Sequence, residues 1–207
     1  MSVVSASAAP TPLDRWARLR ARFDGVLMRP PAPVQLPTAP AALDPRWQAW
    51  CHQADAVAVA AVRAGAGVEA TLDHAMQVLD GSVALAACGG RLAGWRYRLG
   101  LKAREFLQAQ PRLADPWDAG WLQPGPAVLA RLAAFQPRRH TLVVVPAAQV
   151  AEVLVWLAAR PVTVAAPGSL RLRLLLVCPP GQPGLARLEA ALQSQAWAPL
   201  SAGLWLE

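Results

Sequence analysis

The pattern of hydrophobic and polar positions divides the chain into a first half with helical periodicity and a second half in which helices and strands alternate. The clearest strand is residues 141–145, TLVVV, an uncharged run rich in β-branched side chains. Residues 148–159 follow with hydrophobic positions at helical spacing. The order predicted for the second half is αβαββα, with a helix over 126–135, the strand 141–145, a helix over 148–159, strands over 162–165 and 170–177, and a closing helix over 184–197.

Helical signals dominate residues 45–110, where the sequence predicts helices over 46–65, 68–80 and 91–110. Gly65 is a plausible C-terminal stop for the first of them. The last helix has one hydrophobic stripe, which is typical of a protein core or of a helix–helix seam. The members of this stripe are Leu92, Trp95, Leu99, Ala103 and Phe106.

Proline and glycine mark the boundaries between these regions. Residues 29–45 are rich in proline, which predicts a semi-rigid extended linker, and residues 114–126 are expected to form a turn-rich hinge. The predicted fold class is α/β, with a mainly helical N-terminal region and a small C-terminal αβαββα domain. The expected division is a leader with a short amphipathic helix and the linker over 1–45, a helical region over 46–113 and the α/β domain over 114–207.

Two helices offer candidate surfaces for a partner. In residues 14–23, hydrophobic side chains fall on one side and arginines on another, which favours docking on a partner or a membrane surface, or packing on the protein itself. In the helix over 148–159, the stripe that includes a tryptophan is otherwise polar, so this tryptophan is expected to contact a partner or to cover the edge of its own sheet. The candidate partner-binding residues are Trp16, Leu19, Phe23, Trp156 and Arg160.

The charge balance points to an acidic partner. The chain has 20 Lys and Arg against 13 Asp and Glu, a formal net charge of +7. These charges are spread along the chain without a block of like sign. Arg171 and Arg173 alternate with leucines, which predicts that both lie on the exposed face of a half-covered sheet. A basic nucleic-acid-binding α/β module therefore remains an alternative.

The residues that carry most enzyme chemistry are few and scattered. His52, His74 and His140 form none of the spacings of a zinc site, and His140 is expected to cap a strand edge. The glycine-rich stretches lack the preceding strand of a phosphate-binding loop, and no GxSxG occurs. We therefore expect a protein with no catalytic, metal or cofactor site and no small-molecule substrate. A small enzyme of unrecognised type is the remaining alternative.

The three cysteines are odd in number and lie far apart, which favours free thiols in a reducing compartment. The N-terminus lacks the pattern of a secretory signal, and no run of about 18 apolar residues occurs. The expected location is the cytoplasm.

The C-terminal order of elements resembles the C-terminal domain of the FliH/SctL family, the stator (peripheral-stalk) proteins of flagellar and type III secretion ATPases. The segments that carry the resemblance are RRHTLVVVP, AAQVAEVLVWLAA, PVTVAA, LRLRLLLVCPPG and LARLEAALQSQ, between residues 138 and 195. DPWDAGWLQP, WLAA and LRLRL also resemble pieces of the SctK accessory proteins of the sorting platform. The resemblance implies a scaffold with a secretion ATPase and cytoplasmic ring proteins as partners, a possible homodimer, and a place peripheral to the inner membrane through those partners.

Overall fold

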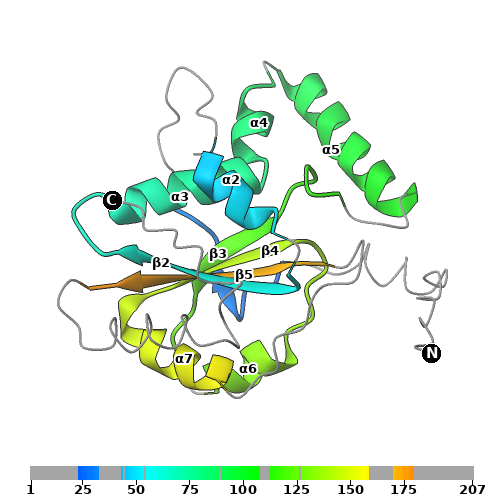
Figure 1. The fold of residues 1–207 in the computed structure, drawn as a ribbon. Coiled ribbons are helices and arrows are strands. Elements are labelled where there is room, and N and C mark those ends of the chain that lie inside the picture. The colour runs from blue at the N-terminus through cyan, green and yellow to red at the C-terminus, as the bar shows by residue number, and fades with distance from the viewer. Residues whose placement is uncertain are drawn as a thin grey trace, which may run out of the picture.

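The computed structural model describes most of the chain between residues 23 and 179. The described residues form an α/β fold, in which a five-stranded sheet lies between two layers of helices (Figure 1). The description covers residues 23–32, 43, 45–53, 55–88, 90–107, 112–125, 127–158 and 170–179. The strands are β1 (Met28–Arg29), β2 (Val57–Arg63), β3 (Asp118–Leu122), β4 (Thr141–Val145) and β5 (Leu172–Cys178), and the helices are α2 (Pro45–Cys51), α3 (Val68–Leu79), α4 (Ser82–Ala86), α5 (Arg91–Leu107), α6 (Val128–Ala134), the 3-10 turn η1 (Ala147–Gln149) and α7 (Val150–Ala158).

The sheet has the strand order β1-β3-β4-β5-β2. The four longer strands run parallel to their neighbours, whereas β1 pairs antiparallel with β3. A parallel sheet is covered on both faces, so its strands are formed by nearly continuous apolar runs. The runs TLVVV in β4 and LRLLLVC in β5 are buried over their whole length. These two strands therefore occupy the interior of the sheet.

Successive side chains of each strand point to opposite faces of the sheet and build two separate cores. On one face, Val143 and Leu174 pack with Val153 of α7. On the other face, Val144 packs in a cluster that includes Trp50 of α2. Figure 1 shows the corresponding layers, with α6 and α7 on one side of the sheet and α2, α3 and α4 on the other.

Most of the predicted elements that fall on described residues are confirmed. The strand 141–145 has the bounds that the sequence predicts, because its side chains are uncharged and β-branched. The strand predicted over 162–165, the closing helix over 184–197, and residues 33–42 of the predicted linker lie outside the described residues. The other confirmed elements are the helices at Val68–Leu79, Arg91–Leu107, Val128–Ala134 and Val150–Ala158 and the strand at Leu172–Cys178.

The helix predicted over residues 46–65 is wrong beyond Cys51. The chain leaves α2 there, and Val57–Arg63 forms β2, which pairs in parallel with β5. The sequence of β2, VAVAAVR, is a short apolar run, and such a run fits a buried strand and a buried helix equally well by its periodicity. Because of β2, the sheet includes a strand from the region predicted as helical as well as strands from the C-terminal region.

The turn-rich hinge predicted over residues 114–126 contains a strand, β3, and this expectation is wrong. β3 is buried throughout and lies between β1 and β4. Its glycine, Gly120, reflects a close approach of the neighbouring strand. A Cβ at this position would lie 2.6 Å from the carbonyl oxygen of Arg29 and 3.1 Å from the Cβ of Met28. A glycine inside a strand can thus mark a tight contact instead of a turn.

Candidate functional site

Only two of the five predicted partner-binding residues lie in the described part of the chain. Trp16, Leu19 and Arg160 lie outside it. Phe23 is partly buried and packs against the core that includes α6 and α7. Trp156 is 8% exposed and belongs to the same core, which agrees with the alternative that it covers its own sheet and contradicts an exposed polar stripe.

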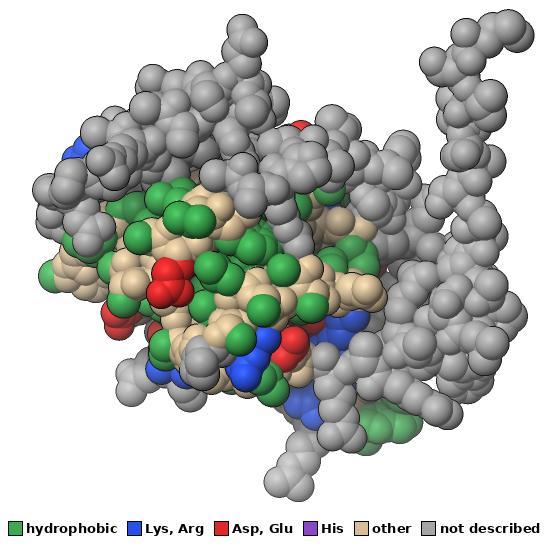
Figure 2. All heavy atoms as spheres, turned by 90° about the horizontal axis from the view of Figure 1, so that it is seen from below, with side chains coloured by type: hydrophobic (Ala, Val, Ile, Leu, Met, Phe, Trp, Pro, Cys, Tyr) green, Lys and Arg blue, Asp and Glu red, His purple; other side chains and the backbone are tan. Residues whose placement is uncertain are grey.

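The buried side of the helix α7 includes the positions that the spacing predicts, and it is broader than predicted. Trp156 joins Val153 and Leu157 in the core, whereas Val155 is 71% exposed. The sequence of α7, VAEVLVWLA, has one charged residue, so its periodicity does not show where the buried side ends. On the face of the molecule that carries α6 and α7, hydrophobic side chains lie between a few charged ones (Figure 2).

A hydrophobic stripe on α5 is the first candidate site. Five large hydrophobic side chains are exposed among the described residues, and three of them lie on this helix. Leu92, Trp95 and Leu99 are 79%, 60% and 47% exposed. At about 100° per residue, they fall on one side of the helix. The sequence identifies this stripe, but the structure leaves it exposed instead of placing it in the core.

The helix α5 is held to the protein through its opposite side. Gly94 faces α4, where a Cβ added to it would lie 3.4 Å from Cδ1 of Leu85. The hydroxyl of Tyr97 lies 3.0 Å from the place that a Cβ on Gly81 would take. Gly81 directly precedes α4 and has a φ of 81°. Figure 1 shows α5 extending beyond α4, away from the sheet. The contacts of α5 with α4 therefore turn its hydrophobic stripe outwards.

Positive charge surrounds this stripe. The sequence of α5 contains five Arg or Lys and one Glu, which gives 5 − 1 = +4. Arg96 and Arg98 are exposed and lie on the two flanks of the stripe at helical spacing. The outward side of α5 thus combines an apolar ridge with basic flanks.

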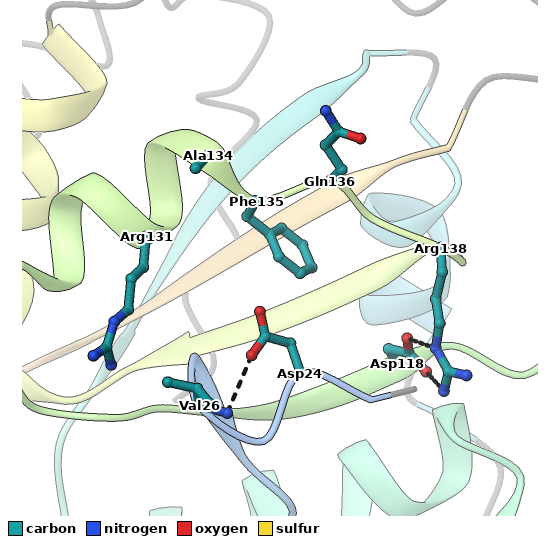
Figure 3. Close-up of a pocket in the computed structure, with 8 residues that line it drawn as sticks. All are labelled: Asp24, Val26, Asp118, Arg131, Ala134, Phe135, Gln136 and Arg138. Atoms are coloured by element: carbon teal, nitrogen blue, oxygen red, sulfur yellow. Dashed lines mark hydrogen bonds and ion pairs between the residues drawn. The ribbon is translucent and has the colours of Figure 1, made fainter. Parts of the chain in front are cut away.

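The second candidate is a pocket of about 480 Å³ between the turn after Phe23, the start of β3 and the end of α6 (Figure 3). Asp118 and Arg138 form a bidentate ion pair there, with distances of 2.6 Å and 2.8 Å. Oδ1 of Asp24 accepts hydrogen bonds from the backbone N–H groups of Val26 and Leu27 and so shapes the turn. The lining residues are Asp24, Val26, Asp118, Arg131, Ala134, Phe135, Gln136 and Arg138.

This pocket offers polar contacts but no nucleophile–base pair. Its eight lining residues include no His, Cys, Ser, Thr or Tyr. The carboxylate of Asp118 is engaged by Arg138, while Arg131 and Gln136 add further hydrogen-bonding groups. The arrangement can hold a small polar molecule by charge and hydrogen bonds, and it indicates no reaction.

Arg173 is fully buried, so the expectation of an exposed face for this residue is wrong. Its guanidinium points towards α2, whose last carbonyl groups lack partners within the helix. Burial lowers the pKa of Arg173 to about 10, so the side chain remains a cation at neutral pH. The guanidinium donates hydrogen bonds to the carbonyl oxygens of Trp50, Cys51, Gln53, Asp55 and Leu172, at 2.7–3.2 Å.

His140 is buried beside this arginine and links two strands. Its Nδ1 accepts a hydrogen bond from the backbone N–H of Arg171 at 3.1 Å, just before β5, which agrees with the expected role at a strand edge. The ring lies against Trp117, with 5.2 Å between the ring centroids. Burial, followed by the charges of Arg171 and Arg173, lowers the pKa of His140 to about 4. At neutral pH the imidazole is therefore neutral and serves as an acceptor.

We expect the free energy of unfolding to fall as the pH is lowered from about 6.5 to about 4. In this range His140 binds a proton in the unfolded chain but resists it in the folded protein, where Arg171, Arg173 and His52 oppose protonation and Asp115 favours it. The loss is at most about 1.4 kcal/mol per pH unit. Urea unfolding at several pH values in this range should show that the free energy of unfolding falls less steeply with decreasing pH in His140→Asn than in the wild type. Asparagine keeps a hydrogen-bond acceptor at this position. An identical slope for the variant and the wild type would contradict this.

Two of the three described thiols, those of Cys51 and Cys178, are not poised for reaction. Cys51 and Cys178 are buried, and burial raises the pKa of both, that of Cys51 to about 12. Within the described ranges, no three His, Cys, Asp or Glu side chains are placed to hold a metal ion. In the same part of the chain, none of the helices has the length and apolar character needed to cross a membrane.

Comparison of the sequence with protein-family models gives no match, and comparisons with curated proteins and with solved structures give no significant match.

Proposed function

We propose that this protein is a non-enzymatic adaptor that binds another protein along the outward side of α5. The observation that carries the proposal is the exposure of Leu92, Trp95 and Leu99 on a helix that is held by its opposite side. Exposed hydrophobic patches rimmed by polar residues are typical of interaction sites. Tryptophan and arginine are also the residues that contribute most often to binding energy at such sites.

We further propose, from the resemblance to the FliH/SctL family, that the protein acts in the cytoplasm as a stator or sorting-platform component of a type III secretion or flagellar apparatus. Its partners would then be a secretion ATPase and cytoplasmic ring proteins, and it would lie at the inner membrane through them. The order of β4, α7 and β5 supports this proposal, because the resemblance rests on the same order.

Nucleic acid is the second candidate partner, favoured by the net charge of +7 and by the exposed Arg96 and Arg98. Phosphate contacts would make such binding fall steeply with salt. The apolar ridge between the two arginines favours a protein, because phosphates gain nothing from contact with hydrophobic side chains.

The proposal is tested by recovering partners from the native cells with the tagged full chain. The test variant carries Leu92→Ser, Trp95→Ser and Leu99→Ser. The control is Val155→Ser, which removes an exposed hydrophobic side chain from α7. Because all four side chains are exposed, circular dichroism and the melting temperature should change little in either variant.

After nuclease treatment, the wild type and the control should recover the same proteins, and the triple variant should recover them at least about ten-fold less. A secretion ATPase or ring protein in this set would support the secretion proposal. Equal recovery by all three chains, or recovery that nuclease abolishes, would contradict binding of a protein through α5.

A further inference from the structure

We infer that the partner segment bound along α5 is an acidic amphipathic helix, an inference that rests on the proposed function. Leu92, Trp95 and Leu99 are separated by three and then four residues. This is the a-d-a spacing of a coiled-coil seam, which is narrower than the hydrophobic face of a helix that packs on a core. A narrow ridge of this kind fits against the hydrophobic positions of one other helix.

The dimensions of α5 allow such a contact. The helix has 17 residues, which corresponds to a length of about 25 Å. Its opposite side is held by α4, so a partner helix can lie along the outward side without displacing an existing contact of Gly94 or Tyr97.

The charges beside the ridge define the chemistry of the partner. When Leu92 is assigned to position a, Arg96 and Arg98 fall at the flanking e and g positions, which contact the partner helix in a coiled coil. The one carboxylate in the sequence of α5, Glu105, stands seven positions from Arg98 and nine from Arg96, so it is not an i,i+3 or i,i+4 neighbour of either. A partner with Glu or Asp at its own flanking positions would form bidentate ion pairs with the two guanidinium groups.

Other occupants of this surface fit less well. A second copy of the chain would bring Arg96 and Arg98 against the same arginines, which is unfavourable. An anionic membrane would attract the arginines, but a ridge of Leu92, Trp95 and Leu99 is narrower than the broad apolar face with which an interfacial helix enters lipid. These alternatives are therefore outcomes of the test.

The test compares two synthetic helical peptides of about 21 residues, with leucine at positions a and d and either Glu or Lys at the flanking positions. Binding to the full chain is measured by fluorescence anisotropy of the labelled peptide. We expect the Glu peptide to bind at least about ten-fold more tightly than the Lys peptide. The preference should shrink between about 0.05 M and about 0.5 M salt, because exposed ion pairs are screened.

Two variants and two further probes sharpen the result. Arg96→Glu combined with Arg98→Glu should reverse the preference in favour of the Lys peptide, and Leu99→Ser should weaken binding of the Glu peptide while Val155→Ser leaves it unchanged. Phosphatidylglycerol vesicles and a short DNA duplex replace the peptides in parallel measurements. The inference is overturned by equal binding of the two peptides, by sedimentation showing dimers that Leu99→Ser dissociates, or by binding to vesicles or duplex that exceeds binding to the Glu peptide.

The same charge-reversal variant separates this inference from the function on which it rests. If the triple serine variant loses its cellular partners and the charge-reversal variant keeps them, the adaptor function stands and the acidic-helix inference fails. If neither variant loses partners, both fail. Loss of partners in both variants supports both.

Discussion

Arg173→Met is expected to lower the free energy of unfolding by about 3 kcal/mol or more, because hydrogen bonds to a charged group contribute about 1.5–3 kcal/mol each and the guanidinium donates several of them. The guanidinium is fully buried and satisfies carbonyl oxygens at the end of α2, among them those of Trp50, Cys51 and Gln53. Methionine preserves much of the apolar stem but donates no hydrogen bond. The carbonyl oxygen of Trp50 would keep its hydrogen bond from the backbone N–H of Gln53, but the other carbonyl groups would lose a donor, at about 1–3 kcal/mol each where water cannot reach them.

Urea-induced unfolding measures this loss, with Arg171→Met as the matched control on the same segment. Arg171 is partly exposed, so its substitution should change stability by no more than about 1 kcal/mol. Arg173→Lys should fall between the two, because an ammonium keeps the charge but cannot reach all the carbonyl groups. A loss below about 1 kcal/mol for Arg173→Met would show that the guanidinium does not hold α2 to the sheet.

Gly120→Ala is expected to destabilise the protein by about 1–3 kcal/mol, the range typical of overpacking. The added Cβ would lie 2.6 Å from the carbonyl oxygen of Arg29 and 3.1 Å from Cζ of Phe23. The first of these atoms belongs to the backbone of β1 and cannot move without disturbing the pairing with β3. The substitution should therefore separate the edge strand from the sheet.

Hydrogen exchange at the backbone N–H of Gln123, which donates to the carbonyl of Leu27 at 2.9 Å, reports this separation directly. Exchange should become faster in Gly120→Ala, and urea unfolding should show the loss of stability. Gly125→Ala is the control, because no atom lies within 4 Å of a Cβ at that position. Equal stability of the two variants would contradict the close approach of β1 to Gly120.

The parts of the fold that could be predicted are those in which one physical signal dominates. β4 and β5 are uninterrupted apolar runs, so burial on both faces identifies them. β2 carries an apolar run of the same kind but with three alanines, which fit a helix as well as a strand. Its identity depends on the pairing with β5, and a pairing between residues more than one hundred positions apart is not visible in local periodicity.

Arg173 illustrates a second limit. Alternation of arginine and leucine along a strand normally indicates that one face of the sheet is exposed to solvent and the other is buried. Here the side of the sheet that carries Arg173 is covered by α2, and the helix end supplies the acceptors that make a buried cation tolerable. Arg173 is buried because α2 lies over β5. This packing is not visible in the local sequence.

The position of the hydrophobic stripe on α5 could be predicted from the sequence, but its exposure could not. The spacing of Leu92, Trp95 and Leu99 identifies the stripe, but hydrophobicity alone assigns such a stripe to the core. Its exposure is determined by Gly94 and Tyr97, which let the opposite side of α5 approach α4. These two residues give no strong hydrophobic signal in the sequence. Trp156 is buried for the converse reason: α7 is so apolar that the width of its buried side cannot be read from its sequence.

The most direct test of the adaptor function is photo-crosslinking in the native cells from position 99 of the full chain. Leu99→p-benzoylphenylalanine places the crosslinker on the outward side of α5, and Val155→p-benzoylphenylalanine places it at an even more exposed position, on α7 in the other layer of helices. We expect a protein adduct from position 99 that is absent from position 155 and absent when Leu92 and Trp95 are both replaced by serine. No adduct from position 99, or the same adducts from both positions, would contradict it.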